Sequence, residues 1–325
     1  MDEENNTIQT NLTTERFFNN ATTTDFFDWS LQNRNAYYVN LIERIIALFG
    51  ILLNAITIIM LLSLDGRLKT QLKLILSLAI SDGLVACSHF ILTFYIFPSA
   101  LKAHKISVLP VLEKIIVNTV LAFLYTVSQF AGLGTMCAIT VDIFIKVRKP
   151  LRYKILMSKR RGNIIIPCLW GIPILLLLTL SVFAVYQFNI TLLSYMYMYG
   201  SILYCVICLI FFFICMPIYI SIFCTIRSFM LRQPSAYRHS TKKTAITFLL
   251  IMATYFICIL PNIAFVLIFT ANLSYQERML ALDVASCLYT LNTVLDPIIY
   301  ATRIPEIRTR YKRFCNTMHP CIHHY

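Results

Sequence analysis

Long uncharged runs alternate with short polar segments along this 325-residue chain. Seven runs reach the length of about 20 mostly apolar residues that a helix needs to cross a lipid bilayer. They lack the alternation with a period of two that a membrane barrel strand shows. The pattern therefore predicts an all-α fold, a seven-transmembrane helix bundle. The predicted spans are 41–63, 72–97, 109–147, 163–186, 196–228, 241–271 and 278–301.

Polar segments flank the predicted bundle, which occupies residues 40–301. Residues 1–39 are rich in Asn and Thr and are interpreted as an extracellular glycosylated arm. They show no basic segment followed by an apolar one, so we expect no cleavable signal peptide. Residues 302–325 are interpreted as an amphipathic helix and a short cytoplasmic tail.

The amphipathic helix is predicted from spacing. Ile304, Ile307, Tyr311 and Phe314 fall on one helical face, and basic residues occupy the opposite face. Such a helix lies along the inner leaflet of a membrane. Cys315 at its end is a candidate for lipidation, and an unmodified thiol is the alternative.

The composition supports a membrane protein. Only 13% of the residues are charged, against about 25% in soluble domains. The net charge of +13 does not indicate a nucleic-acid binder, because the Lys and Arg clusters lie between long apolar runs. The sequence contains no zinc-type His cluster, nucleophile motif or phosphate loop, so we expect neither an enzyme nor a bound metal of those kinds.

Two signals orient the chain. Most of its 28 Lys and Arg residues lie in the loops after the first, third and fifth spans and in the tail, and such loops are cytoplasmic. Five Asn-X-Ser/Thr sequons, which mark the opposite side, lie in the N-terminal arm and in the loops after spans four and six. We therefore expect a multi-pass plasma membrane protein with the N-terminus extracellular and the C-terminus cytoplasmic. The sequons are at Asn5, Asn11, Asn20, Asn189 and Asn272.

The eleven cysteines predict no disulfide. Nine lie within the predicted spans and two in the tail. Because none lies clearly in an outer loop, we expect no outer disulfide bridge, and small apolar core residues are the simplest interpretation of the nine.

Four polar residues lie inside predicted spans: Asn54, Asp82, Asn292 and Asp296. An acid within hydrocarbon is costly and indicates function by default. Two acids placed close together repel each other unless a cation or a proton lies between them. The sequence leaves open a bound Na⁺ near Asp82, a shared proton, or a purely structural network.

Proline occurs inside the last three spans, at Pro217, Pro261 and Pro297. A proline inside a helix leaves one carbonyl without its donor and bends the helix. We therefore expect a bundle that can change shape.

Taken together in this order, the motifs resemble those of the rhodopsin-like (class A) G protein-coupled receptors over about residues 40–315. Within that family, the inner loop at 147–154 is similar to adenosine receptors. The Asp-Pro-Ile-Ile-Tyr segment at 296–300 and the outer loop without Cys are similar to melanocortin receptors. The residues that carry the resemblance are Asn54, Leu78 to Asp82, Asp142, Pro150 to Tyr153, Trp170, Pro217, Cys258 to Pro261, and Asp296 to Tyr300.

The chain departs from the family at its switch residues. The Asp-Arg-Tyr triplet of the family is Asp142-Ile143-Phe144 here. The resemblance aligns the span-five tyrosine with Thr225 and the span-six tryptophan with Ile259. These departures put ordinary G protein signalling in doubt.

The family comparison also predicts the ligand pocket. The acid that binds amine ligands aligns with Tyr125, and the acids that bind melanocortin peptides align with Leu92, Asn118 and Ala122. We therefore expect a neutral, aromatic pocket. Its predicted residues are Tyr125, Gln129, Asn262, Phe265 and Tyr289.

The sequence supports a divergent receptor that binds an extracellular ligand and transmits a helix rearrangement to a cytoplasmic G protein. The alternative is a receptor-like binding or scaffold protein with weak or no coupling, because Ile143 replaces the arginine. A channel or transporter has only Asp82 and Asp296 in its favour. The implied partners are an unidentified ligand, a G protein and membrane lipid, without nucleic acid. The predicted G protein face comprises Asp142, Ile143, Phe144, Pro150, Lys242, Lys243 and Tyr300.

Overall fold

The computed structural model describes residues 23–64, 69–101, 111–186, 190–228, 235–268 and 275–318. All of the regular structure in these segments is helical. The elements are α2 (Thr23–Leu62), α3 (Thr70–Leu101), α4 (Val111–Arg148), the 3₁₀ helix η1 (Pro150–Arg152), α5 (Tyr153–Leu156), α6 (Lys159–Tyr186), α7 (Ile190–Ser228), α8 (Ser235–Ile268), α9 (Tyr275–Arg303) and α10 (Pro305–Met318).

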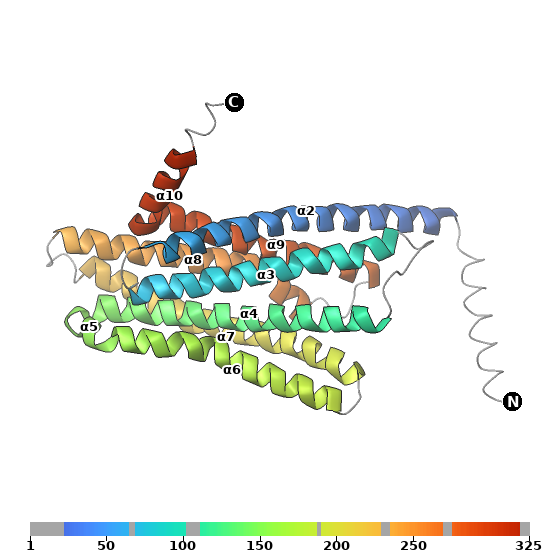
Figure 1. Ribbon diagram of the computed structural model, residues 1–325, viewed down its shortest axis with the longest axis horizontal. Coiled ribbons are helices and arrows are strands. Elements are labelled where there is room, and N and C mark those ends of the chain that lie inside the picture. The colour runs from blue at the N-terminus through green and yellow to red at the C-terminus, as the bar shows by residue number, and fades with distance from the viewer. Residues whose placement is uncertain are drawn as a thin grey trace.

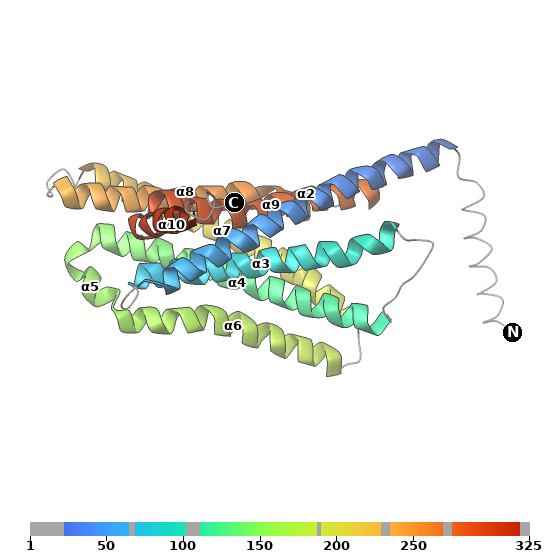
Figure 2. The ribbon, with the colours of Figure 1, turned by 45° about the horizontal axis from the view of Figure 1, so that its top comes forward.

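Seven long helices run lengthwise beside one another, and the short α10 crosses their direction (Figures 1 and 2). In hydrocarbon a helix satisfies its own backbone hydrogen bonds, which is why uncharged runs of this length adopt this form. The seven-transmembrane bundle with a short eighth helix, predicted from the sequence, is confirmed.

Six of the described helices are long and apolar enough to cross a membrane: α2, α3, α4, α6, α7 and α8. The seventh, α9, carries Glu277, Asp283 and Asp296 among its residues. It packs mainly against α2 and α8; Asp296 is buried within the bundle, Asp283 is partly buried and Glu277 is exposed. This placement explains why α9 is the least apolar of the seven.

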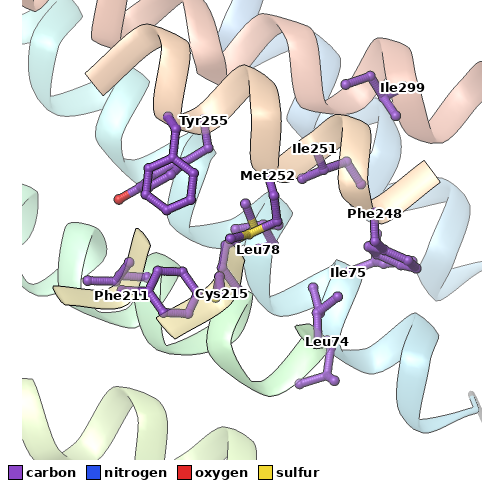
Figure 3. Close-up of a cluster of buried hydrophobic side chains, with 14 of the residues drawn as sticks. Leu74, Ile75, Leu78, Phe211, Cys215, Phe248, Ile251, Met252, Tyr255 and Ile299 are labelled. Carbon is purple, nitrogen blue, oxygen red and sulfur yellow. The ribbon is translucent and has the colours of Figure 1, made fainter. Parts of the chain in front are cut away.

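A buried apolar cluster joins the long helices, and Figure 3 shows part of it. Leu74, Ile75 and Leu78 of α3 face Phe248, Ile251 and Met252 of α8. Phe211 and Cys215 of α7 close the cluster from another side. Side chains from four or more helices therefore form one continuous core.

Small and polar contacts fix the helix spacing. Trp170 of α6 donates its indole N–H to Ser77 Oγ over 3.0 Å, and Ser77 Oγ lies 3.1 Å from Thr135 Oγ1 of α4. These contacts join α3, α4 and α6, because each polar group in the membrane finds a partner on a neighbouring helix.

The predicted amphipathic helix is α10. Ile307 is buried against the bundle, and the hydroxyl of Tyr311 lies 2.9 Å from Thr57 Oγ1 of α2. Lys69 and Glu306 form an exposed ion pair at 3.3 Å. One face of α10 therefore docks on the bundle, as the spacing of its apolar residues predicted.

Some predictions fall outside what the structure describes. The five sequon asparagines lie outside the described segments, and so does Cys321. Cys315 lies within α10, but its side chain is not described. The nine cysteines of the spans are free thiols, while residues 1–22 of the predicted arm are outside the described segments.

Candidate functional site

One end of the bundle is basic, and we call it the basic end: it contains Lys69, Lys146, Lys243 and Arg303. These four side chains line a cavity of about 620 Å³. Leu72, Ile75 and Phe248 supply apolar parts of its wall, and α3, α4, α8 and the junction of α9 with α10 enclose it. The cavity therefore suits a partner with both apolar and acidic groups.

The wall of this cavity is built on the end of α4. Asp142 is buried, and the Tyr153 hydroxyl donates a hydrogen bond to its Oδ1 over 2.9 Å. The other carboxylate oxygen, Oδ2, is buried without a hydrogen-bond partner. Tyr153 also lines the cavity, so this bond ties the basic loop to the helix beside the opening.

Ile143 follows Asp142 and is only 1% exposed. It belongs to the buried apolar cluster together with Ile75, Phe248 and Ile222. Phe144 is partly buried beneath the guanidinium of Arg148, which lies 5.9 Å from the ring centre. Apolar packing thus takes the position at which the related receptors carry an arginine.

The residues of the predicted G protein face lie at different depths. Asp142, Ile143 and Tyr300 are buried in the bundle, and Ile143 and Tyr300 belong to the apolar cluster. Lys243 lines the cavity. The side chains of Pro150 and Lys242 are outside the described part of the structure. Lys69 and Arg303 also line the cavity and were not part of the prediction.

The sequence comparison aligns the family's span-five tyrosine with Thr225, and Thr225 donates its hydroxyl hydrogen bond within α7, to the carbonyl of Ser221. Tyr219, on the same helix, is buried with its hydroxyl 3.4 Å from Thr140 Oγ1 of α4. Tyr219 therefore provides a hydroxyl of α7 that faces α4.

The predicted polar core is brought together by α2, α3 and α9. Asn54 donates from Nδ2 to the Thr293 carbonyl over 2.7 Å and to the Gly50 carbonyl over 3.0 Å. Asp82 and Asp296 lie against each other, and Asn292 Nδ2 donates to Asp296 Oδ2 over 3.4 Å.

A small cavity borders this core. Asp82, Ser128, Gln129, Asn292 and Thr293 contribute to its lining, and it has room for about one water molecule or an ion of similar size. Asp82 Oδ2 and Asn292 Oδ1 are buried without hydrogen-bond partners. This set of oxygen atoms fits a hard monovalent cation or a water molecule.

Of the five predicted pocket residues, three come together. The rings of Tyr125 and Tyr289 meet edge to face with centres 6.3 Å apart, and Tyr289 and Gln129 border the same small cavity. Phe265 is buried on α8, and Asn262 is half-buried one turn earlier on that helix.

A buried acid and histidine adjoin this group and were not predicted. Glu43 Oε1 of α2 lies 2.8 Å from His89 Nδ1 of α3. The hydroxyls of Ser286 and Thr290 on α9 donate to the same oxygen over 3.0 and 3.3 Å. The His89 ring meets Tyr125 edge to face at 4.8 Å.

An ionisable pair therefore adjoins Tyr125 at the edge of the predicted pocket. The signal in the sequence was His89, since a histidine well inside a predicted span is unusual enough to indicate a specific partner.

Comparison with known proteins identifies the architecture. Residues 54–300 match the family described as 7 transmembrane receptor (rhodopsin family). Melanocortin receptor 5 from Mus musculus is 26% identical over 250 residues, covering 73% of this chain and 71% of the relative. Melanocortin receptor 4 from Danio rerio is 28% identical over 204 residues, covering 58% and 57%.

The resemblance to melanocortin receptors predicted from the sequence is thus confirmed at the level of the family. Its members are receptors rather than enzymes, which agrees with the prediction that this chain has no catalytic centre. From its seven-helix architecture and the matched residues, the chain belongs to the rhodopsin family of seven-transmembrane receptors.

Proposed function

We propose that this chain binds an extracellular ligand and transmits a helix rearrangement across the plasma membrane to a cytoplasmic G protein. The observation that carries the proposal is the cavity at the basic end, where four cationic side chains surround apolar wall residues. A partner segment with acidic and apolar side chains would fit both features.

The mechanism begins at Tyr125 and Tyr289, whose rings adjoin the polar core. A ligand that binds one helix arrangement more tightly than another shifts the population toward it. Pro217, Pro261 and Pro297 lie inside α7, α8 and α9 and give these helices places to bend. Movement of α8 would widen the basic-end cavity, which α8 lines through Lys243 and Phe248.

The ligand site is aromatic, with one ionisable pair beside it. Tyr125 and Tyr289 favour a partly apolar ligand, and the Glu43–His89 pair adds a polar contact. The relatives are named melanocortin receptors, which makes a melanocortin the first ligand to test.

The decisive residue is Ile143. An Ile143→Arg substitution would place a guanidinium beside Asp142 Oδ2, which has no hydrogen-bond partner. One charge-assisted hydrogen bond contributes about 1.5 to 3 kcal/mol, so a guanidinium that leaves Asp142 and binds the G protein instead should raise nucleotide exchange about tenfold or more. The measurement compares wild type, Ile143→Arg and Ile143→Leu, each with and without a melanocortin.

Ile143→Leu is the matched control, because it preserves the apolar packing and should leave nucleotide exchange at the wild-type rate. Nucleotide exchange stimulated by the wild-type chain would support the proposed receptor function. Complete silence of wild type, with signal appearing only in Ile143→Arg, would instead establish the alternative, a receptor-like binding or scaffold protein. The burial of Ile143 in the apolar cluster is what favours that alternative.

A Na⁺ ion is proposed for the polar core. Asp82, Asn292 and the neighbouring Ser128 would hold it, and its positive charge would offset the repulsion between the carboxylates of Asp82 and Asp296. If so, replacing K⁺ by Na⁺ raises the unfolding temperature of wild type, because a ligand that binds only the folded state stabilises it. Asp82→Asn should abolish the difference; an equal response of both proteins to Na⁺ would exclude the site.

A further inference from the structure

Three tyrosine hydroxyls meet in the middle of the bundle, and we call these residues the tyrosine cluster: Tyr204 of α7, Tyr255 of α8 and Tyr289 of α9. The hydroxyls of Tyr204 and Tyr255 are 2.6 Å apart, and those of Tyr204 and Tyr289 are 3.4 Å apart. All three side chains are buried. Cys208 Sγ lies 3.5 Å from the Tyr255 hydroxyl.

The two distances describe unequal contacts of the Tyr204 hydroxyl, which can donate to only one of its two neighbours. Hydroxyl pairs in proteins prefer about 2.7 to 2.8 Å, so the Tyr204–Tyr255 bond is strong and the Tyr204–Tyr289 contact is long. Each phenol has only one proton to donate. A small displacement of Tyr289 toward Tyr204 would therefore let the two contacts exchange roles.

The cluster lies between the candidate ligand pocket and the polar core. On the pocket side, the Tyr289 ring meets that of Tyr125. On the other side, Tyr255 and Tyr289 both line the small cavity that Asp82 borders. A change at Tyr125 thus reaches the cavity beside Asp82 through Tyr289.

Tyr255 supplies the hydrogen-bonding group that Ile259, on the same helix, lacks. Ile259 is fully buried and offers no hydrogen-bonding group, whereas Tyr255 lies one turn away on the same helical face. Tyr255 supplies both an aromatic ring and a hydroxyl at this level of α8. Its ring also contacts Phe256 edge to face at 5.5 Å.

We propose that the tyrosine cluster is a hydrogen-bond switch, which holds α7 and α8 together until movement of Tyr289 offers Tyr204 a different partner. The proposal deepens the proposed receptor function by naming the contact that ligand binding would rearrange. It is testable without ligand or G protein, so failure of coupling leaves the test intact.

The test follows the basic end of α7 with a fluorophore that responds to its environment. Cys224 is exposed there and carries the label, in a protein with Cys168, Cys315 and Cys321 replaced by serine. Tyr204→Phe and Tyr255→Phe each keep the ring and remove one hydroxyl. Losing one buried hydrogen bond should shift the ratio of the two helix arrangements about fivefold, seen as a change in the fluorescence lifetimes.

Two comparisons make the result specific. The Tyr204→Phe and Tyr255→Phe double variant should shift the populations no further than either single variant, because both remove the same bond. Thr254→Val is the matched control: the Thr254 hydroxyl donates only to carbonyls of its own helix, α8, so its removal should leave the lifetimes unchanged. Tyr289→Phe should have the smaller effect expected of a 3.4 Å contact.

Three outcomes would overturn the proposal. Phe variants that lower the unfolding temperature but leave the Cys224 lifetimes unchanged would show a purely structural contact. Additive effects of Tyr204→Phe and Tyr255→Phe would show independent contacts. An equal response to Thr254→Val would show that the loss of any hydroxyl on α8 gives the same change.

Discussion

Glu43 is an acid enclosed by three helices, with His89 and two hydroxyls as its partners. The side chains of Glu43 and His89 are only 3% and 7% exposed. Taking a charge out of water is costly unless a close partner compensates it. The pair therefore joins α2, α3 and α9 near Tyr125 only while both members are present.

Removing only His89 or only Glu43 should lower the stability of the fold more than removing both. His89→Leu leaves the Glu43 carboxylate buried without its partner, which we expect to cost about 3 to 5 kcal/mol and to lower the unfolding temperature by roughly 10 °C. Glu43→Leu combined with His89→Leu should recover much of this loss. Unfolding can be followed by reaction of a thiol-specific dye with buried cysteines such as Cys208.

An exposed ion pair provides the control. Lys69 and Glu306 lie 3.3 Å apart with side chains 75% and 41% exposed, and such pairs contribute about 0 to 1 kcal/mol. Lys69→Ala should therefore leave the unfolding temperature nearly unchanged. If the Glu43→Leu and His89→Leu double variant were as unstable as His89→Leu alone, the loss of stability would come from altered packing rather than from an uncompensated charge.

Sequence alone located some of these residues and missed others for physical reasons. Asp82 and Asp296 could be predicted as special residues because an acid in the middle of an apolar run is costly and needs a specific partner. Glu43 lies close to the end of its span, where an acid is expected to face water. The contact of Tyr219 with α4 could not be predicted from spacing, because it depends on the rotation of α7 about its axis.

At the level of elements, α2 and α9 approach closely at Gly50. A Cβ atom added there would overlap Thr293 Oγ1 and would lie 3.1 Å from the Cβ of Ala86. The absence of a side chain at Gly50 also leaves room for Asn54 to reach the Thr293 carbonyl. One glycine thus permits both the helix spacing and the polar contact.

Gly50→Ala should force α2 away from α9 and weaken the Asn54–Thr293 bond. Overpacking of this kind costs about 1 to 3 kcal/mol, which should appear as a fall of several degrees in the unfolding temperature. Gly171 of α6 is the matched control, because nothing lies within 4 Å of an added Cβ. Gly171→Ala should be neutral or stabilising, since alanine favours a helix by about 1 kcal/mol over glycine.

An equal loss of stability in both glycine variants would indicate a general effect of changing glycine and not the α2–α9 approach.

The membrane spans could be predicted from the sequence because a bilayer imposes a length on every apolar helix. Other features did not follow: α2 begins at Thr23, before the predicted span, and part of the basic loop folds into η1 and α5. The structure of those segments depends on local contacts and not on the thickness of the hydrocarbon layer.

At the level of the whole molecule, charge is distributed unevenly along the bundle. The cavity at the basic end contains Lys69, Lys146, Lys243 and Arg303, while the sequons lie in the segments that the charge pattern assigns to the opposite side. Each Lys or Arg near an anionic inner leaflet is stabilised by about 1 kcal/mol. We propose that the basic end faces the cytoplasm and that the N-terminus is extracellular.

Antibody access to terminal tags in intact cells tests this orientation. A tag before Met1 should be detected without permeabilisation, and a tag after Tyr325 only after it. Asn5→Gln, Asn11→Gln and Asn20→Gln combined should reduce the apparent mass if the arm is glycosylated, while the tags keep their access. Detection of the C-terminal tag on intact cells would invert the bundle, place the basic cavity outside the cell and remove the physical basis for a G protein partner.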